Sequence, residues 1–254
     1  MLGSIQINNV NKNFDEVHVL NNFSLNIEPG SFVSLIGPSG CGKSTLLRII
    51  GGLEKQYEGS VYLDGERITK AGSDRGFAFQ GSNLFPWLTV QGNVSFGLKA
   101  RRIYKERKND VADIIKLVGL QGFENSFPHQ ISGGMQQRAS LARALVGHPK
   151  VLLLDEPLGA LDAFTRMNLQ DEILRIKKEN NMTMLMVTHD VDEAIYMSDK
   201  VVVMSARPSR VEAVIDIEIP HPRVRVQDTF ALYRNKILEI LNFGGQLHEA
   251  EYNI

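Results

Sequence analysis

One glycine-rich segment restricts the fold of this chain more than any other feature of its sequence. The segment matches the pattern G-x-x-x-x-G-K-[ST] and lies between a predicted strand over 31–36 and a predicted helix over 45–50, as a phosphate-binding loop requires. Glycines let successive backbone N–H groups turn toward one point, and the helix end adds positive potential, so the loop suits a polyphosphate. Lys43 would place a charge on the β- and γ-phosphates, and the Ser44 hydroxyl would bind Mg²⁺. The predicted nucleotide-binding residues of the segment are Gly37, Pro38, Ser39, Gly40, Cys41, Gly42, Lys43, Ser44 and Thr45.

Composition excludes several other classes of protein. The chain has 254 residues, of which 43% are hydrophobic and 22% charged, as in a globular protein with a substantial core. A net charge of -1 excludes nucleic-acid binding through bulk charge. The single cysteine, Cys41, excludes a disulfide framework, and we expect it to be a small filler in the loop. The densest apolar stretches are strand-sized and no signal peptide is recognised, so we expect a cytoplasmic protein that reaches a membrane only through a partner.

Strand and helix signals alternate along the chain. A hairpin is predicted across Asp64-Gly65, and the apolar spacing predicts helices over 111–118 and 135–146, a helix carrying Leu169 and Ile173, and a closing helix over 223–241. This alternation implies a mainly parallel sheet covered by helices. The predicted strands span 4–10, 31–36, 61–63, 66–68, 76–79, 151–154, 183–187 and 200–204.

Two acidic residues follow a strand of four apolar residues. Asp155 and Glu156 come directly after Val151–Leu154, and the carboxyl end of a parallel strand would place them beside the phosphate-binding loop. There Asp155 would hold Mg²⁺, directly or through water, and Glu156 would polarise the attacking water as a general base. A solvated strand end or a helix-capping acid is the alternative reading, and the phosphate-binding loop favours the functional one.

A third group of motifs resembles the ATP-binding cassette (ABC) ATPases between about residues 5 and 210. Ile131–Arg138 resembles the signature motif, although Ile131 and Met135 depart from the common pattern. Gln80 resembles the Q-loop glutamine, and Thr188-His189-Asp190 resembles the switch histidine. Gly159-Ala160-Leu161-Asp162 resembles the D-loop, with Gly159 where Ser is common. Phe14 stands where this family often stacks an aromatic ring on adenine, and a core position is the equal alternative.

The resemblance implies an α/β fold with a P-loop NTPase (RecA-like) core, a mainly parallel sheet, an N-terminal antiparallel β subdomain and an inserted α-helical subdomain. We expect one ABC ATPase domain over residues 1–254, in which 1–88 and 149–254 form the core with its β subdomain and 89–148 form the helical subdomain. In such proteins two subunits dimerise head to tail and sandwich ATP between the loop of one subunit and the signature of the other.

The resemblance also implies roles for individual residues. Glu156, His189 and Gln80 would be catalytic: His189 would orient the γ-phosphate and water, and Gln80 would link Mg²⁺ to the transport subunits. The expected metal ligands are Ser44, Gln80 and Asp155. Beyond the phosphate-binding loop, the expected nucleotide contacts are Phe14, Ser132, Gly133, Gly134, Gln136 and Asp162.

Further segments are similar to the nitrate/sulfonate/taurine group of bacterial importers. They are residues 79–90, 188–194, 205–211 and 219–223. This resemblance implies an ATPase with Mg²⁺ as cofactor, peripheral on the cytoplasmic face of the membrane. Its partners would be a second copy, two transmembrane permease subunits and, indirectly, an extracytoplasmic solute-binding protein, with no nucleic acid. Trp87 would then be an exposed anchor for the permease, or else a core residue between subdomains.

Two other functions are compatible with a phosphate-binding loop. A P-loop kinase or nucleotide-dependent regulator would leave residues 132–136 and His189 without roles. A soluble cassette protein acting on DNA or ribosomes usually carries coiled-coil insertions or two cassettes, and neither is found in this sequence. The transporter ATPase is therefore the favoured reading, and the sequence does not identify the solute.

Overall fold

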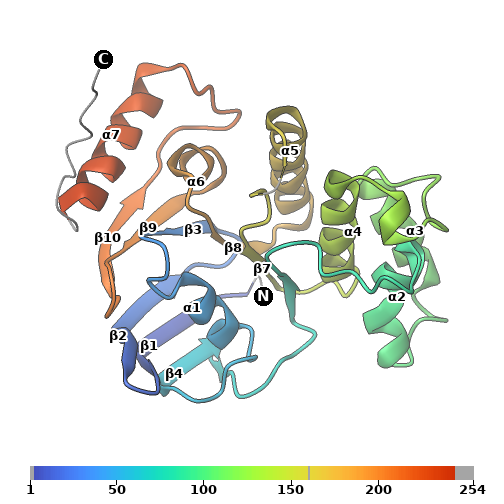
Figure 1. The fold of residues 1–254 in the computed structure, drawn as a ribbon, viewed down its shortest axis with the longest axis horizontal. Helices are drawn as coiled ribbons and strands as arrows, with labels where there is room; N and C mark the ends of the chain where they lie inside the picture. The colour runs from blue at the N-terminus through green and yellow to red at the C-terminus, as the bar shows by residue number, and fades with distance from the viewer. Residues whose placement is uncertain (1–2, 160, 244–254) are drawn as a thin grey trace.

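The computed structural model describes residues 3–159 and 161–243, which form two sheets and their flanking helices (Figure 1). The larger sheet has six strands in the order β10-β9-β3-β8-β7-β6, and all its pairs except β10 with β9 are parallel. The predicted, mainly parallel sheet is therefore confirmed, and the carboxyl ends of its parallel strands share one edge. The six strands are β3 (Phe32–Ile36), β6 (Arg75–Ala78), β7 (Val151–Asp155), β8 (Thr183–Val187), β9 (Lys200–Met204) and β10 (Val211–Asp216).

The smaller sheet is antiparallel and has four strands in the order β2-β1-β4-β5. Its hairpin turns at Asp64-Gly65, as predicted, and both residues have positive φ, of 51° and 81°. That geometry suits the two-residue turn for which Asp-Gly is favoured. The four strands are β1 (Ile5–Phe14), β2 (Val17–Ile27), β4 (Glu58–Leu63) and β5 (Glu66–Arg67).

Both faces of the six-stranded sheet are covered by other elements. Successive side chains of a strand point to opposite faces, so the central strands contribute to two apolar clusters. Val151 and Leu153 pack in an apolar cluster with helix α1 (Lys43–Ile50) and the antiparallel sheet. Leu152 and Leu154 pack on the other side with helix α5 (Ala163–Asn180). Helix α1 thus lies between the two sheets, and its first residue, Lys43, lies at the carboxyl edge of the larger one.

The remaining helices fall into two groups. Helices α2 (Val90–Ala100), α3 (Lys108–Leu117) and α4 (Gly133–Leu145) contact one another and stand to one side of the sheets (Figure 1). A single 3₁₀ turn, Pro128–Gln130, precedes α4. Helices α6 (Val191–Met197) and α7 (Asp228–Phe243) share an apolar cluster with β9 and β10.

The closing helix begins at Asp228, so the prediction of a helix from residue 223 is wrong for its first turn. Arg223 is only 5% exposed, because its guanidinium group turns inward to backbone carbonyl oxygens. It donates to the oxygens of Ile219 at 2.7 Å and Ser198 at 2.6 Å. This arginine holds the connecting segment against α6, which an amphipathic helix would not allow.

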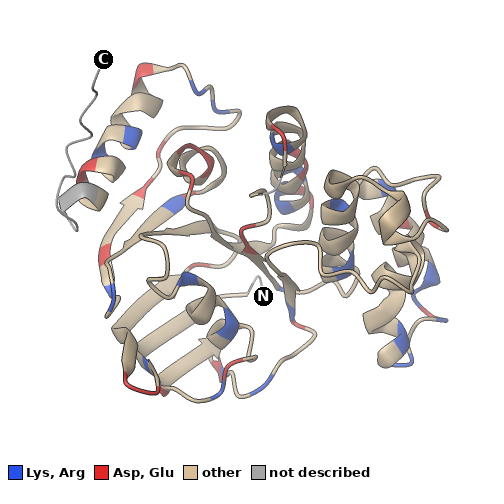
Figure 2. Ribbon diagram, viewed as in Figure 1, with Lys and Arg blue, Asp and Glu red and all other residues tan. Residues whose placement is uncertain are grey.

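Charged side chains are mixed in sign along the outer elements. Figure 2 shows Lys and Arg interspersed with Asp and Glu along α5, α7 and the connecting loops. This distribution agrees with the net charge of -1. Within the described ranges, no helix is long and apolar enough to cross a membrane.

Candidate functional site

The phosphate-binding loop connects β3 to α1 along the carboxyl edge of the sheet. Gly42 precedes the helix with φ of 108°, in the region that favours glycine. A Cβ atom there would lie 2.7 Å from Val19 Cγ1, and one at Gly37 would lie 2.7 Å from the Met204 carbonyl oxygen. Both glycines are therefore required by the close approach of neighbouring segments, and Gly42 is required by its positive φ as well.

Lys43 begins α1 and lies inside the curve of the loop, with 7% of its surface exposed. Its ammonium group donates hydrogen bonds to the carbonyl oxygens of Gly37 at 2.8 Å and Pro38 at 2.9 Å. Both partners are neutral, so the ammonium charge is not cancelled by them. Lys43 therefore presents a positive charge at the place where the loop would receive phosphate oxygens.

Ser44 and Asp155 are brought together from different elements. The Ser44 hydroxyl donates to Asp155 Oδ1 at 2.8 Å. Asp155 is 2% exposed, and burial raises the pKa of its carboxyl, although the Ser44 hydrogen bond opposes that change. Among the described residues, no group of three or more His, Cys, Asp and Glu side chains could hold a metal by itself. The Ser44–Asp155 pair would thus hold Mg²⁺ only together with other oxygens, such as those of phosphate or water.

Replacing Asp155 with Asn should raise the thermal unfolding midpoint of the nucleotide-free protein at pH 7. A pKa raised in the folded state means that the buried, ionised carboxylate costs stability above that pKa. The asparagine cannot ionise, and its amide oxygen can still accept from Ser44, so about 2–4 °C should be gained per kcal/mol recovered. The gain should shrink as the pH falls toward the unfolded-state pKa of about 3.9. Thermal denaturation between pH 4 and 7.5 measures it.

Asp162→Asn is the matched control for this prediction. Hydrogen bonds from Thr165 lower the pKa of the Asp162 carboxyl, so the loss of its charge should not stabilise the protein at pH 7. A midpoint that stays unchanged or falls in Asp155→Asn would contradict the assignment of a destabilising, desolvated carboxylate at this site.

The three predicted catalytic side chains meet beside the loop. Gln80 follows β6 and donates to Glu156 Oε2 at 3.1 Å, and His189 Nδ1 lies 3.7 Å from Glu156 Oε1. Glu156 has φ of 45°, a conformation that is uncommon for residues other than glycine and is often found at functional sites. Because β3, β6, β7 and β8 run parallel, the segments that follow them converge on one place.

These groups line a single cavity of about 500 Å³, a volume that suits a small ligand. Its walls combine backbone of the loop, one ammonium group, one carboxylate and one imidazole. Of the predicted loop and metal-binding residues, Gly37, Pro38, Cys41 and Asp155 do not line it, and Cys41 is buried, as expected for a filler. The lining residues are Ser39, Gly40, Gly42, Lys43, Ser44, Thr45, Gln80, Glu156 and His189.

The residues of the predicted signature lie elsewhere on the chain. Ser132 caps α4 by accepting from Met135 N at 3.2 Å, and both Ser132 and Gly133 are exposed. The Gln136 amide is held within the chain: it accepts from Ser82 at 3.1 Å and donates to the Pro128 oxygen at 2.9 Å. Neither the signature nor the D-loop contributes to the wall of the 500 Å³ cavity.

The predicted D-loop runs directly into α5. Asp162 caps that helix, accepting from Thr165 N at 3.0 Å, whereas Ala160 lies outside the described residues. A Cβ at Gly134 would lie 2.8 Å from Thr165 Cγ2, which shows that the starts of α4 and α5 are packed together. The N-terminal ends of α4 and α5 therefore lie side by side, and Phe164 in the first turn of α5 is 81% exposed.

Two aromatic residues with open alternatives are both exposed. Phe14 is 45% exposed, so it is not a core residue, and the Lys12 ammonium lies 4.2 Å from its ring centroid. Trp87 is 70% exposed, so the alternative of a core tryptophan between subdomains is wrong. Its ring lies 5.5 Å from that of Phe85, which contacts Phe96 at 4.5 Å. The pattern of the sequence did not single out Phe85 and Phe96, which become a patch only through folding.

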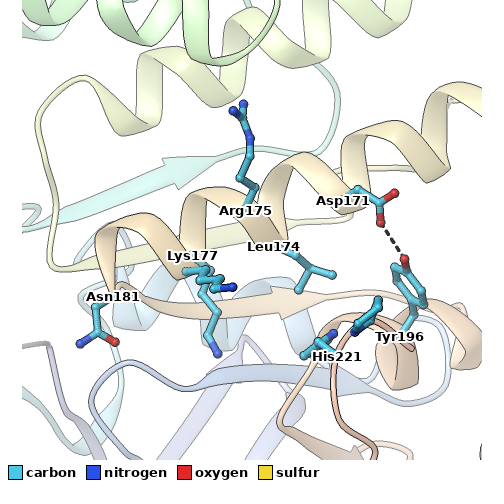
Figure 3. Close-up of a pocket in the computed structure, with 9 residues that line it drawn as sticks. Asp171, Leu174, Arg175, Lys177, Asn181, Tyr196 and His221 are labelled. Carbon is cyan, nitrogen blue, oxygen red and sulfur yellow. Dashed lines mark hydrogen bonds between the residues drawn. The ribbon is translucent and has the colours of Figure 1, made fainter. Parts of the chain in front are cut away.

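A second cavity, of about 540 Å³, lies between α5, α6 and residues 221–222. Figure 3 shows Leu174, Tyr196 and His221 facing one another there, while Arg175 turns away. None of the residues predicted for nucleotide or metal binding lines it. Predicted nucleotide-binding and catalytic residues line the cavity at the phosphate-binding loop, so that cavity is the candidate functional site.

Comparisons with known proteins agree with this geometry. A family model described as ABC transporter matches residues 20–159. An aliphatic sulfonates import ATP-binding protein, SsuB, of Bacillus cereus is 49% identical over 97% of this chain and 99% of its own length. The protein of that name from Bacillus subtilis is 45% identical over 92% of this chain and 91% of its own length. Among solved structures, a dimeric post-hydrolysis state of the ATP-binding cassette MJ0796 bound to ADP and Pi is 34% identical, with a TM-score of 0.74 over 85% of this chain and all of that one.

Proposed function

This chain belongs to the ABC transporter family, and from that premise we propose that it is the ATP-hydrolysing subunit of an importer for aliphatic sulfonates. One observation carries the proposal of ATP hydrolysis at this site. Lys43, Ser44, Gln80, Glu156 and His189 line one cavity at the carboxyl edge of the sheet, and Asp155 accepts a hydrogen bond from Ser44. The sulfonate class of solute is taken from the similar importer proteins of Bacillus.

The residues of the cavity divide the chemistry between them. The loop N–H groups and Lys43 bind the β- and γ-phosphates, and Ser44 and Asp155 are the side chains that would hold Mg²⁺. When bound, Mg²⁺ neutralises charge that develops on the phosphate oxygens. Glu156 accepts the proton of the attacking water, and Gln80 donates a hydrogen bond to its carboxylate. His189, whose Nδ1 lies 3.7 Å from the other carboxylate oxygen, orients the γ-phosphate and the water.

The signature surface supplies the rest of the site in a second copy of the chain. Ser132 and Gly133 are exposed at the N-terminal end of α4, where backbone N–H groups and the helix dipole favour an anion. They do not face the cavity of their own chain, so contact with a γ-phosphate requires a neighbouring subunit. ATP is then enclosed between two chains, and its hydrolysis lets them separate. The dimeric relative bound to ADP and Pi supports this arrangement.

The proposed importer needs partners that cross the membrane. Two permease subunits would bind the chain at the cytoplasmic face, with Trp87 and its neighbours Phe85 and Phe96 as an aromatic anchor close to Gln80. An extracytoplasmic solute-binding protein would deliver the solute to those permeases. A contact between Trp87 and the permease would couple the cavity to transport, because the same loop carries Gln80, which lines the cavity.

Reconstitution tests this proposal. The chain, co-purified with its permease subunits, should hydrolyse ATP faster in liposomes when the matching solute-binding protein carries an alkanesulfonate than when it is empty. Nitrate is the contrasting solute in a parallel assay, and taurine, itself an aminoalkanesulfonate, tests how broad the sulfonate class is. Stimulation by nitrate alone would contradict the proposed sulfonate class, and phosphorylation of a small molecule in place of phosphate release would contradict the ATPase assignment.

A further inference from the structure

The turn that carries His189, residues 188–190, is hydrogen-bonded to Glu193, a buried residue of α6. His189 itself is exposed, and its contact with Glu156 is long, so the backbone of residues 188–190 sets its position. The Thr188 hydroxyl accepts from Asp190 N at 3.1 Å, and it lies beside the Glu193 carboxyl, where it opposes the rise in pKa that burial causes. Glu193, on α6, is 5% exposed, and its own N–H donates to Asp190 Oδ1 at 3.0 Å. Glu193 is therefore joined to this turn by its backbone N–H, and its side chain lies beside the Thr188 hydroxyl.

A second buried side chain connects Glu193 to α5. Gln170 is 2% exposed, and its amide donates to Glu193 Oε1 at 3.3 Å. Its amide oxygen accepts from Arg225, which precedes α7 and lies with its guanidinium carbon 3.8 Å from the Tyr196 ring centroid. A continuous line of hydrogen bonds thus runs from Arg225 through Gln170 and Glu193 to the histidine turn.

Burying the Glu193 carboxyl group costs folding free energy that an apolar contact would not cost. Burial raises the pKa of the Glu193 carboxyl, and Asp190 adds to the effect, whereas the Thr188 and Gln170 hydrogen bonds and the Arg166 charge oppose it. An apolar residue would fill the same space without desolvating a carboxyl group. Polar groups that are kept buried at such a cost fix one arrangement of the elements that they join.

We propose that Glu193 is a positioning residue for His189, held in place by Gln170 and Arg225. The proposal rests on the role given to His189 in the proposed function. The segment before α7, remote from the nucleotide cavity in the sequence, thereby influences how the imidazole is aimed. A misplacement of about 1 Å at a reacting group can lower turnover by roughly 100-fold, so the turn is sensitive to this support.

Three substitutions separate positioning from general stability. Glu193→Ala removes the acceptor, Glu193→Gln keeps an amide oxygen that can accept from Gln170 and Thr188, and Arg225→Met removes the outer hydrogen bond at a partly exposed site. Tyr196→Phe is the matched control: it removes the Tyr196–Asp171 hydrogen bond of 2.6 Å, which joins the same two helices but lies outside the line (Figure 3).

Steady-state hydrolysis and imidazole NMR of ¹⁵N-histidine-labelled protein are the two readouts, with the His189 signals assigned from His189→Asn. Glu193→Ala should lower kcat by about tenfold or more with KM for Mg-ATP within about twofold, and it should shift the His189 signals. Glu193→Gln should restore both, and Arg225→Met should shift the His189 signals in the same direction. Tyr196→Phe should leave both readouts as in the unmodified chain.

Unmoved His189 signals in a folded Glu193→Ala protein, or an equal shift in Tyr196→Phe, would overturn the proposal. If Glu193→Ala does not fold, Arg225→Met decides in the same way. The NMR readout needs no hydrolysis, so an inactive unmodified chain would count against the proposed function alone and leave the coupling to be decided by the spectra.

Discussion

Lys43→Ala is expected to abolish measurable ATP turnover. The Lys43 ammonium is the charge held inside the phosphate-binding loop, and its two hydrogen-bond partners are carbonyl oxygens that cannot replace it. Loss of one such group from a preorganised site lowers turnover by about 100- to 1,000-fold. Steady-state release of phosphate from Mg-ATP measures the loss, and binding of a fluorescent ATP analogue shows how much affinity is lost with it.

Lys43→Met is the control for this experiment, because it keeps the buried aliphatic stem and removes only the charge. Both variants should be inactive, and only Lys43→Ala should lose the packing of the stem at the start of α1. Normal phosphate release in Lys43→Met would refute the assignment of the loop as the catalytic phosphate site.

Glu156→Gln should bind ATP and fail to hydrolyse it. The amide has nearly the shape of the carboxylate but cannot accept a proton, so turnover should fall by about 100- to 10,000-fold. Since ATP would join two subunits until it is hydrolysed, this variant should accumulate as a dimer. Light scattering with and without saturating Mg-ATP gives the mass directly, against 28.4 kDa for one chain.

The double substitution Lys43→Ala with Glu156→Gln is the control for ATP-dependent association. It should remain monomeric at the same ATP concentration, because its phosphate-binding loop lacks the charge. A Glu156→Gln protein that stays monomeric with Mg-ATP, or that hydrolyses ATP at the rate of the unmodified chain, would contradict the role given to Glu156.

The centre of the site could be predicted from sequence because the parallel sheet dictates it. Asp155 ends one short apolar strand, His189 follows another, and the phosphate-binding loop follows a third. In the sheet these strands are neighbours, in the order β3-β8-β7, so the segments that follow them must converge. Local patterns therefore sufficed to predict which chemistry gathers there, although the roles of the residues remain predictions.

Other features depend on contacts between segments far apart in the chain. Strands β2 and β10 and helix α6 were not predicted, and helix α2 was predicted only as part of the helical segment 89–148. The N-caps Thr89 and Asp190 begin α2 and α6, but neither helix has a long apolar period to mark it in the sequence. The first turn expected for the closing helix is lost to the buried bonds of Arg223. The Gln170–Glu193 contact joins residues 23 positions apart on different helices, and no spacing rule points to it.

The sequence also could not predict which aromatic residues are exposed. Trp87 and Phe14 had two readings each, and only the packing of the folded chain decides that both reach the surface. Phe85 and Phe96 join Trp87 through the fold of the segment before α2. Propensity describes the residues of a segment, whereas exposure is decided by what the rest of the chain places over it.

A mixing experiment tests most directly whether two chains share each catalytic site. Lys43→Met keeps an intact signature surface, whereas Gly133→Gln keeps an intact phosphate-binding loop and adds a side chain where a Cβ atom meets no other atom of the chain within 4 Å. Each protein alone should release phosphate at a background rate. Their mixture should recover activity, because a mixed dimer contains one site with both halves intact. Activity in Gly133→Gln alone, or a mixture no more active than its components, would contradict a nucleotide site built from two copies of this chain.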